Sequence, residues 1–289
     1  MRPVRALVLT GYGLNCDYET DYVLKLAGAE SHRIHVNELI LGGNSEPETG
    51  LENNHILVVG GGFSWADDHG AGVVLASKMK FNLGDEIERF LHQGKLIIGI
   101  CNGFQALVNF GLFPGYNGNY QERTFAITHN DSGNFVDTWV HLKVNPLSPS
   151  IFTKGIDTID LPVRHGEGKF YAPERDLRHL IENNQVVMQY ADDKDDVANG
   201  RWPMNPNGSL ADIAGICDPT GRVFGLMPHP EAFNHVTNHP DWTRRKEGLL
   251  REGKHIENHE GDGVRIFRNA VEYIRSQMDQ GKFNGIGIE

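Results

Sequence analysis

Cysteine is scarce in this sequence, with three residues in a chain of 289. A small, odd number of cysteines argues against a disulfide scaffold and favours a reducing compartment, with the cytoplasm as the default. No stretch approaches the ~20 consecutive apolar residues that a transmembrane helix needs. The amino-terminal apolar run is also too short for a signal peptide. We therefore expect a cytoplasmic protein without membrane spans.

Positive charge is also in short supply, because 27 Lys and Arg stand against 38 Asp and Glu. The resulting net charge of −11 would repel a phosphate backbone, so nucleic acid is not expected as a partner. The hydrophobic fraction of 39% is ordinary for a folded protein and allows a large core. Because the chain has no Ser/Gly-rich linker and no internal repeat, we expect a single domain over residues 1–289.

The first hundred residues alternate short apolar runs with amphipathic stretches, a spacing typical of βαβ units. Strands are expected at 5–10, 55–59 and 96–100, and helices at 17–27 and 84–93. Beyond residue 115, turn residues separate strands expected at 125–128, 138–144, 186–190, 212–217 and 222–227. The pattern predicts an α/β fold with a flavodoxin-like, doubly wound, mostly parallel sheet and antiparallel additions. A polar insertion at about 233–262 precedes a final helix at about 264–278.

The strand expected at 96–100 runs directly into Cys101, and a helical pattern starts at the next residue. A sharp strand-to-helix turn crowds the positions two before and two after its central residue, and Gly99 and Gly103 occupy both. This is the pattern of a nucleophile elbow with sulfur in place of oxygen. The helix N-terminus would favour the thiolate. We interpret Cys101 as a nucleophile, with a buried structural cysteine as the alternative.

A second reactive group is indicated by the Pro-His-Pro-Glu run at 228–231, after a predicted strand. Pro230 keeps His229 out of the helical region. If the segment is extended, His229 and Glu231 project to the same side, so the carboxylate can fix the imidazole tautomer and stabilise its charged form. His229 is thus the predicted proton donor to a leaving group, and Glu231 its orienting carboxylate.

A glycine-rich turn at 60–64 follows the predicted strand at 55–59 and forms the third element. Consecutive glycines let backbone N–H groups turn toward an oxyanion, and the N–H of Asn102 is expected to be a second donor. A phosphate-binding loop is disfavoured, because the lysine and hydroxyl of the P-loop motif are missing. A plain turn is the remaining alternative.

The motifs Gly-Ile-Cys-Asn-Gly-Phe-Gln at 99–105 and Pro-His-Pro-Glu at 228–231 resemble those of the class I, triad-type glutamine amidotransferases. More closely, the chain is similar to the glutaminase subunits of phosphoribosylformylglycinamidine synthases, a family of purine biosynthesis. Further matches follow in order over roughly residues 4 to 231. They lie at 61–64, 130–132, 139–142, 162–170 and 213–217.

The resemblance implies a role for each matching residue. Cys101 would be the nucleophile, His229 the acid/base and Glu231 its orienter. Gly62 and Asn102 match the oxyanion positions. The remaining positions that the resemblance places at the glutamine site are Gly61, Gln105, Asn130, Asp131 and Ser132.

The same resemblance implies that glutamine is hydrolysed to glutamate and ammonia, which passes to a synthetase subunit. A small accessory subunit would be a further partner. No cofactor is expected in this chain, whereas ATP and magnesium are expected in the synthetase, because nothing here resembles an ATP site. Two alternatives stay open: an amidotransferase subunit for a different acceptor, and a catalytically silent regulatory subunit of the same fold.

Other titratable residues are interpreted as structural. Cys16 follows the first predicted strand at the sheet edge where α/β proteins build sites, but its neighbours supply ordinary turn and cap chemistry. Histidines at 229, 235, 239, 255 and 259 have a spacing that zinc could use, yet no carboxylate or thiol completes the set. The acidic run at 192–196 lacks the glycine and terminal glutamate of a calcium loop. We expect a surface loop in the insertion and no metal site.

Overall fold

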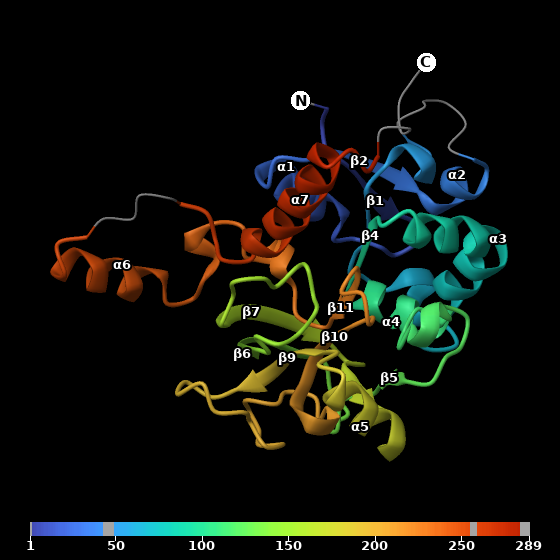
Figure 1. Ribbon diagram of the computed structural model, residues 1–289. Helices are drawn as coiled ribbons and strands as arrows, with labels where there is room; N and C mark the ends of the chain where they lie inside the picture. Colours follow the sequence, from blue (N-terminus) through green and yellow to red (C-terminus); the bar gives the residue numbers. More distant parts are fainter. Residues whose placement is uncertain (1, 43–48, 255–258, 284–289) are drawn as a thin grey trace.

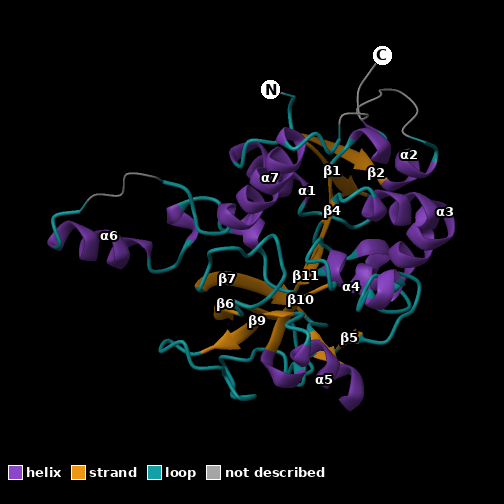
Figure 2. Cartoon of the chain, in the orientation of Figure 1, coloured by secondary structure: helices purple, strands orange, loops and turns teal. Residues whose placement is uncertain are grey.

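The computed structural model describes residues 2–42, 49–254 and 259–283. At its centre lies one nine-stranded sheet (Figures 1 and 2). Five neighbouring strands are parallel, in the spatial order β2 (Glu30–His35), β1 (Arg5–Thr10), β3 (Ile56–Val59), β4 (Leu96–Ile100) and β11 (Val223–Leu226). Four antiparallel strands continue the sheet: β10 (Ile213–Cys217), β9 (Val186–Ala191), β6 (Val136–Val144) and β7 (Thr158–His165). A separate pair joins β5 (Ala126–Thr128) to β8 (Lys169–Tyr171).

Helices cover both faces of the parallel half. On one face, α1 (Asp17–Leu26) packs against α7 (Val264–Asp279). On the other lie α2 (Val36–Ile40), α3 (Val73–His92) and α4 (Asn102–Phe110), and α3 contacts both of the others (Figure 1). The short helix α5 (Glu174–Glu182) accompanies the antiparallel half. No helix in the described part of the chain is long and apolar enough to cross a membrane.

The predicted α/β fold is confirmed, including the doubly wound parallel part and its antiparallel additions. The helix expected at 84–93 begins earlier, at Val73, because Leu75 and Met79 already continue its buried stripe. Two strands of the large sheet were not predicted. The β2 sequence is largely polar because the strand lies at one edge of the sheet, and β7 contains Pro162, which an edge strand tolerates.

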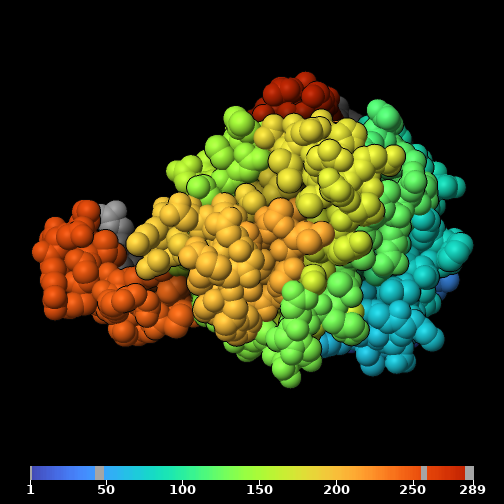
Figure 3. All heavy atoms as spheres, turned by 90° about the horizontal axis from the view of Figure 1, so that it is seen from below, coloured from blue at the N-terminus to red at the C-terminus, as the bar shows by residue number. Residues whose placement is uncertain are grey.

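The insertion expected to be a surface loop contains a helix, α6 (Trp242–Arg251), so that prediction was wrong. Pro240 precedes the first helical residue by two positions, where proline does not interrupt a helix. The helix has no buried residue and stands out from the body of the protein (Figures 1 and 3). His255, one of the spaced histidines, lies outside the described residues.

An ionic cluster around Asp160 of β7 ties this projecting segment to the sheet. The Asp160 carboxylate lies 2.6 Å from His141 Nδ1, accepts a hydrogen bond from Arg245 of α6, and lies 3.3 Å from His239 Nε2. The hydrogen bond to Asp160 raises the pKa of His141 to about 9. Burial alone would raise the pKa of Asp160, but hydrogen bonds from His141 and Arg245 lower it to about 2. The insertion is therefore attached to β7 through charge.

The first turn of α4 packs directly on the end of β3 through Gly103. A Cβ at this position would overlap the Val59 carbonyl and lie 3.0 Å from the carbonyl oxygen of Gly60. Both neighbours are backbone atoms at the centre of the sheet, so they cannot move aside as a flexible side chain could. The approach of helix to strand therefore requires glycine here.

We expect Gly103→Ala to lower the free energy of unfolding by roughly 1–3 kcal/mol, because the added methyl group overpacks this contact. Gly84→Ala in α3 is the matched control, since a Cβ there meets no atom within 4 Å. Alanine should stabilise that helix by about 0.5–1 kcal/mol. Urea unfolding followed by circular dichroism measures both. Equal effects of the two substitutions would contradict the close approach at Gly103.

Candidate active site

Cys101 lies in a strained turn between β4 and α4. Its φ of 51° and ψ of −109° are rare for a residue with a side chain, and such strain collects at functional sites. The turn is tight enough that a Cβ on Gly99 would lie 2.9 Å from the Gly103 carbonyl carbon. The Cys101 side chain is 5% exposed, and Sγ lies 3.7 Å from the carbonyl oxygen of Arg164. This is the geometry of a nucleophile elbow at a helix N-terminus.

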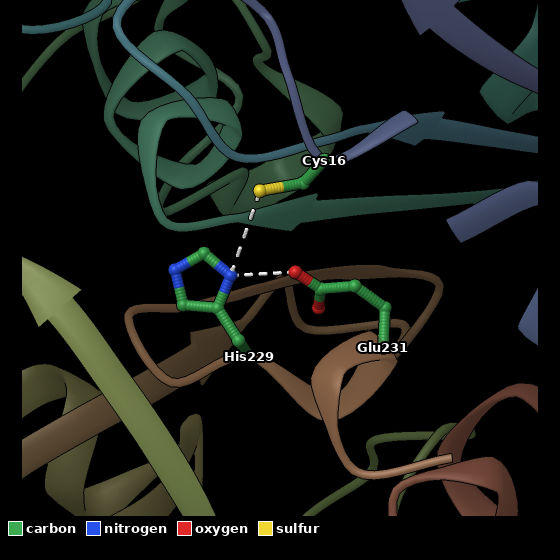
Figure 4. A group of neighbouring side chains, drawn as sticks. All are labelled: Cys16, His229 and Glu231. Carbon is green, nitrogen blue, oxygen red and sulfur yellow. Dashed lines mark hydrogen bonds and ion pairs between the residues drawn. The ribbon is translucent and has the colours of Figure 1, made fainter. Parts of the chain in front are cut away.

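His229 and Glu231 form a buried pair (Figure 4), and the Cys101 side chain is close enough to His229 to raise the His229 pKa. His229 Nδ1 lies 2.5 Å from Glu231 Oε1, and the two residues are 2% and 0% exposed. The sequence analysis considered an extended segment here, but the structure has a 3-10 turn over Pro230–Ala232 instead. The long Glu231 side chain still reaches back to the ring. The opposite ring nitrogen, Nε2, makes no hydrogen bond to a described residue.

The electrostatics of the site favour a charged His229. Burial alone would lower its pKa, but the charge of Glu231 and the Cys101 side chain together raise it well above the usual value. His165, also buried, behaves in the opposite way. Burial, with the charge of His229, lowers the pKa of His165 to about 4. One imidazole can therefore carry charge at neutral pH while its neighbour stays neutral.

The edge strand β7 supports both catalytic candidates through its backbone. The carbonyl oxygen of Pro162 accepts a hydrogen bond of 2.8 Å from the His229 N–H. The carbonyl oxygen of Arg164, two residues further along β7, lies 3.7 Å from the Cys101 thiol. The start of the stretch 162–170, one of the segments that match the family, therefore lies against the proposed triad.

Asn102 connects the elbow to the glycine-rich turn through its side chain. Its Oδ1 accepts a hydrogen bond of 3.1 Å from the Ser64 N–H, and its Nδ2 donates to Asp67 Oδ1 at 2.8 Å. Nδ2 also donates to Gln105 Oε1 at 3.1 Å, and the Gln105 amide donates in turn to the Glu167 carbonyl. The sequence pointed only to the N–H of Asn102, so the role of its side chain was missed.

The proposed oxyanion donors are the N–H groups of Gly62 and Asn102. The Asn102 N–H opens α4, where helix geometry provides no internal acceptor. Gly62 has a φ of 145°, and a Cβ there would overlap the Gly13 carbonyl. The Phe63 N–H donates to that same carbonyl at 2.8 Å, so the segment after β1 clamps the turn in place.

Cys16 is brought to the site by this clamp, although we interpreted it as structural. Its Sγ lies 4.0 Å from His229 Nδ1 (Figure 4). Gly61 lies over both groups, since a Cβ there would be 2.7 Å from His229 Cε1 and 3.1 Å from Cys16 Sγ. The position of Cys16 after β1, at the sheet edge where α/β proteins build sites, was the available signal. The sequence does not show that the turn after β11, which contains His229, folds over the same edge of the sheet.

The residues 130–132, expected to contact glutamine, are held by the same β7 segment. Asn130 is buried, and its Nδ2 donates to the His165 carbonyl at 2.8 Å. Asp131 is exposed and lies 2.6 Å from Lys169 Nζ, while Ser132 is exposed. A contact between these side chains and glutamine stays a prediction.

Comparison with known proteins gives the family. Residues 3–274 match the model of the CobB/CobQ-like glutamine amidotransferase domain. A Methanococcus maripaludis protein, "Phosphoribosylformylglycinamidine synthase subunit PurQ", is 44% identical over 270 residues, covering 93% of this chain and 97% of its own. The PurQ subunit of Dehalococcoides mccartyi is 46% identical over 275 residues, covering 95% and 99%.

A solved structure supports the same family assignment. The chain resembles one from "Structure of PurLQS from Thermotoga maritima", with a TM-score of 0.65 and 27% identity, over 94% of this chain and 100% of that one. The sequence matches cover the nucleophile elbow, the glycine-rich turn and the His229–Glu231 turn together. The chain therefore belongs to the glutamine amidotransferase family, among the PurQ subunits of phosphoribosylformylglycinamidine synthase.

Proposed function

We propose that this chain is a single-domain glutaminase that hydrolyses glutamine to glutamate and ammonia for a phosphoribosylformylglycinamidine synthase. The observation that carries the proposal is the placement of Cys101, in a strained turn at a helix N-terminus, beside the buried His229–Glu231 pair. The names of the PurQ relatives supply the acceptor reaction. Three free cysteines fit the cytoplasm as its compartment.

The proposed chemistry begins with attack of Cys101 Sγ on the glutamine carboxamide. The carbonyl oxygen becomes an oxyanion, which the Gly62 and Asn102 N–H groups are placed to bind. His229 then protonates the departing ammonia and activates water to hydrolyse the γ-glutamyl thioester. Because Glu231 occupies Nδ1, the proton moves at Nε2, the nitrogen without a hydrogen-bond partner among the described residues.

The ammonia has to be passed on directly, since in water at neutral pH it becomes ammonium and loses its nucleophilicity. We propose that the acceptor site, with its ATP and magnesium, lies in a synthetase subunit. The structural relative from Thermotoga maritima comes from an assembly of this kind, PurLQS. An amidotransferase subunit with another acceptor is the alternative that the co-purifying synthetase would reveal.

In the complex with its synthetase, Cys101→Ser should abolish glutamine-dependent synthesis and leave ammonia-dependent synthesis nearly unchanged. The physical reason is that the synthetase needs ammonia but not its source. Product formation with glutamine or with ammonium chloride distinguishes the two activities. Parallel loss of both would make Cys101 structural and would remove the elbow from the mechanism.

Glu231→Gln should lower kcat for glutamine hydrolysis by about 100-fold or more, with a much smaller change in KM. The amide cannot stabilise the imidazolium, so the pKa of His229 falls and the charged form is lost at lower pH than in the wild type. Steady-state glutamate release measures both constants. His229→Ala should be at least as damaging. A wild-type kcat for Glu231→Gln would exclude this carboxylate from the triad.

Binding of the synthetase with its nucleotide and substrate should raise glutamine hydrolysis on the order of tenfold or more, a coupling of about 1–3 kcal/mol. The switch we favour is the glycine-rich turn, because the residues that follow it, Trp65 and Ala66, hold left-handed φ values of 52° and 57°. The measurement is glutamate release by the chain alone and with saturating partner. Equal rates despite complex formation would contradict this control.

A further inference from the structure

Three metal-ligating groups converge where Cys16 meets the His229–Glu231 pair (Figure 4). Cys16 Sγ, His229 Nδ1 and a carboxylate oxygen of Glu231 all lie within 4.8 Å of one another. They come from two separate parts of the chain, the N-cap of α1 and the turn after β11. The three residues are 9%, 2% and 0% exposed, so the convergence is built into the interior rather than arising from mobile surface side chains.

The second carboxylate oxygen of Glu231 has no partner within the described part of the chain. Glu231 Oε1 is occupied by His229, but Glu231 Oε2 is fully buried and makes no hydrogen bond to any described residue. A buried carboxylate oxygen normally has a hydrogen-bond partner or a cation. Thiolate, imidazole and carboxylate are also the ligand types that Zn²⁺ takes in proteins. We propose that a thiophilic divalent cation of the Zn²⁺ class binds Cys16, His229 and Glu231 and thereby switches off the glutaminase.

The ligand spacing requires only small movements. Zn–S and Zn–N bonds of about 2.3 Å and 2.1 Å put tetrahedral sulfur and nitrogen ligands roughly 3.6 Å apart, against the 4.0 Å between Cys16 Sγ and His229 Nδ1. The 2.5 Å contact between His229 and Glu231 has to open, because the ion takes the place of the Nδ1 proton. That proton and the Cys16 thiol proton leave to solvent, and no redox change is involved.

Binding of the ion at Nδ1 of His229 explains why glutamine hydrolysis would stop. With an ion on Nδ1 and a proton on Nε2, the His229 ring has no nitrogen left to accept the proton of Cys101. Glu231, as a metal ligand, also no longer stabilises a charged imidazole. On the side of the glycine-rich turn, Gly61 lies against both groups, and a side chain there would come within 3.1 Å of Cys16 Sγ and 2.7 Å of His229 Cε1.

Direct binding of Co²⁺ to the full chain tests the site without relying on activity. The Cys101→Ala variant is the starting protein, because it removes the other active-site thiol and keeps Cys16 and Cys217. We expect one Co²⁺ per chain with a near-ultraviolet sulfur-to-cobalt charge-transfer band, and displacement of the Co²⁺ by Zn²⁺. Adding Cys16→Ser should remove the band. The matched control is Cys217→Ala, a core thiol on β10, which should leave it intact.

Two results would overturn the site: no thiolate band in Cys101→Ala, or a band that survives Cys16→Ser. Because Cys16→Ser can disturb folding, its circular dichroism and Tm are compared with those of its parent. Glu231→Gln in the Cys101→Ala background provides a second variant that keeps the thiol. It should weaken Co²⁺ binding by about tenfold or more, and an unchanged affinity would remove Glu231 from the ligand set.

Inhibition of the wild-type chain tests the functional half of the proposal. Zn²⁺ should block glutamate release, and a chelator should restore it. Whatever activity Cys16→Ser retains should need at least roughly tenfold more Zn²⁺ for the same fractional inhibition, since one of three ligands is missing. Equal sensitivity of the two proteins would mean that the ion acts at Cys101, which would overturn the proposed switch.

Discussion

The close approach of α4 to the end of β3 is the constraint on which the site depends. With no side chain at Gly103, the first turn of α4 rests against the carbonyls of Val59 and Gly60. This contact puts Cys101 beside the glycine-rich turn and lets the Asn102 side chain reach the Ser64 N–H. The proposed nucleophile and the proposed oxyanion donors thus come from the carboxyl ends of two adjacent parallel strands, where α/β proteins commonly build their sites.

A second requirement is a counter-ion for the buried, charged His229. An imidazolium buried as deeply as that of His229 is stable only with a counter-ion in direct contact, and Glu231 provides it at 2.5 Å. The neighbouring His165 would place a second cation against the first, but its low pKa keeps it neutral. The pair is therefore a single electrostatic unit, which the cation proposed here would enter by replacing its shared proton.

The antiparallel half of the sheet does more than extend the fold. Its edge strand β7 presents the Pro162 carbonyl to His229 and the Arg164 carbonyl to Cys101. The same strand carries Asp160, which holds Arg245 of the projecting helix α6. The strand β7 therefore connects the projecting helix α6 to the backbone groups that contact His229 and Cys101.

Local chemistry in the sequence was enough to identify the fold class, the elbow at Cys101 and the His229–Glu231 turn. Apolar runs, flanking glycines and the Pro-His-Pro-Glu motif each act over a few residues, so each can be read without knowing the rest of the structure. The extent of α3 and the polar edge strand β2 were less accessible, because burial of one face determines them.

Tertiary structure alone decided which distant residues meet. The sequence places Cys16 at the sheet edge where sites form, but it does not show that the Cys16 sulfur lies 4.0 Å from His229 Nδ1, because that contact depends on the clamp between the segment after β1 and the glycine-rich turn. Similarly, Asp160 and Arg245 are 85 residues apart, and only the folding of the insertion onto β7 pairs them. Motifs are local patterns, whereas these contacts depend on strand order and on the path of the chain between strands.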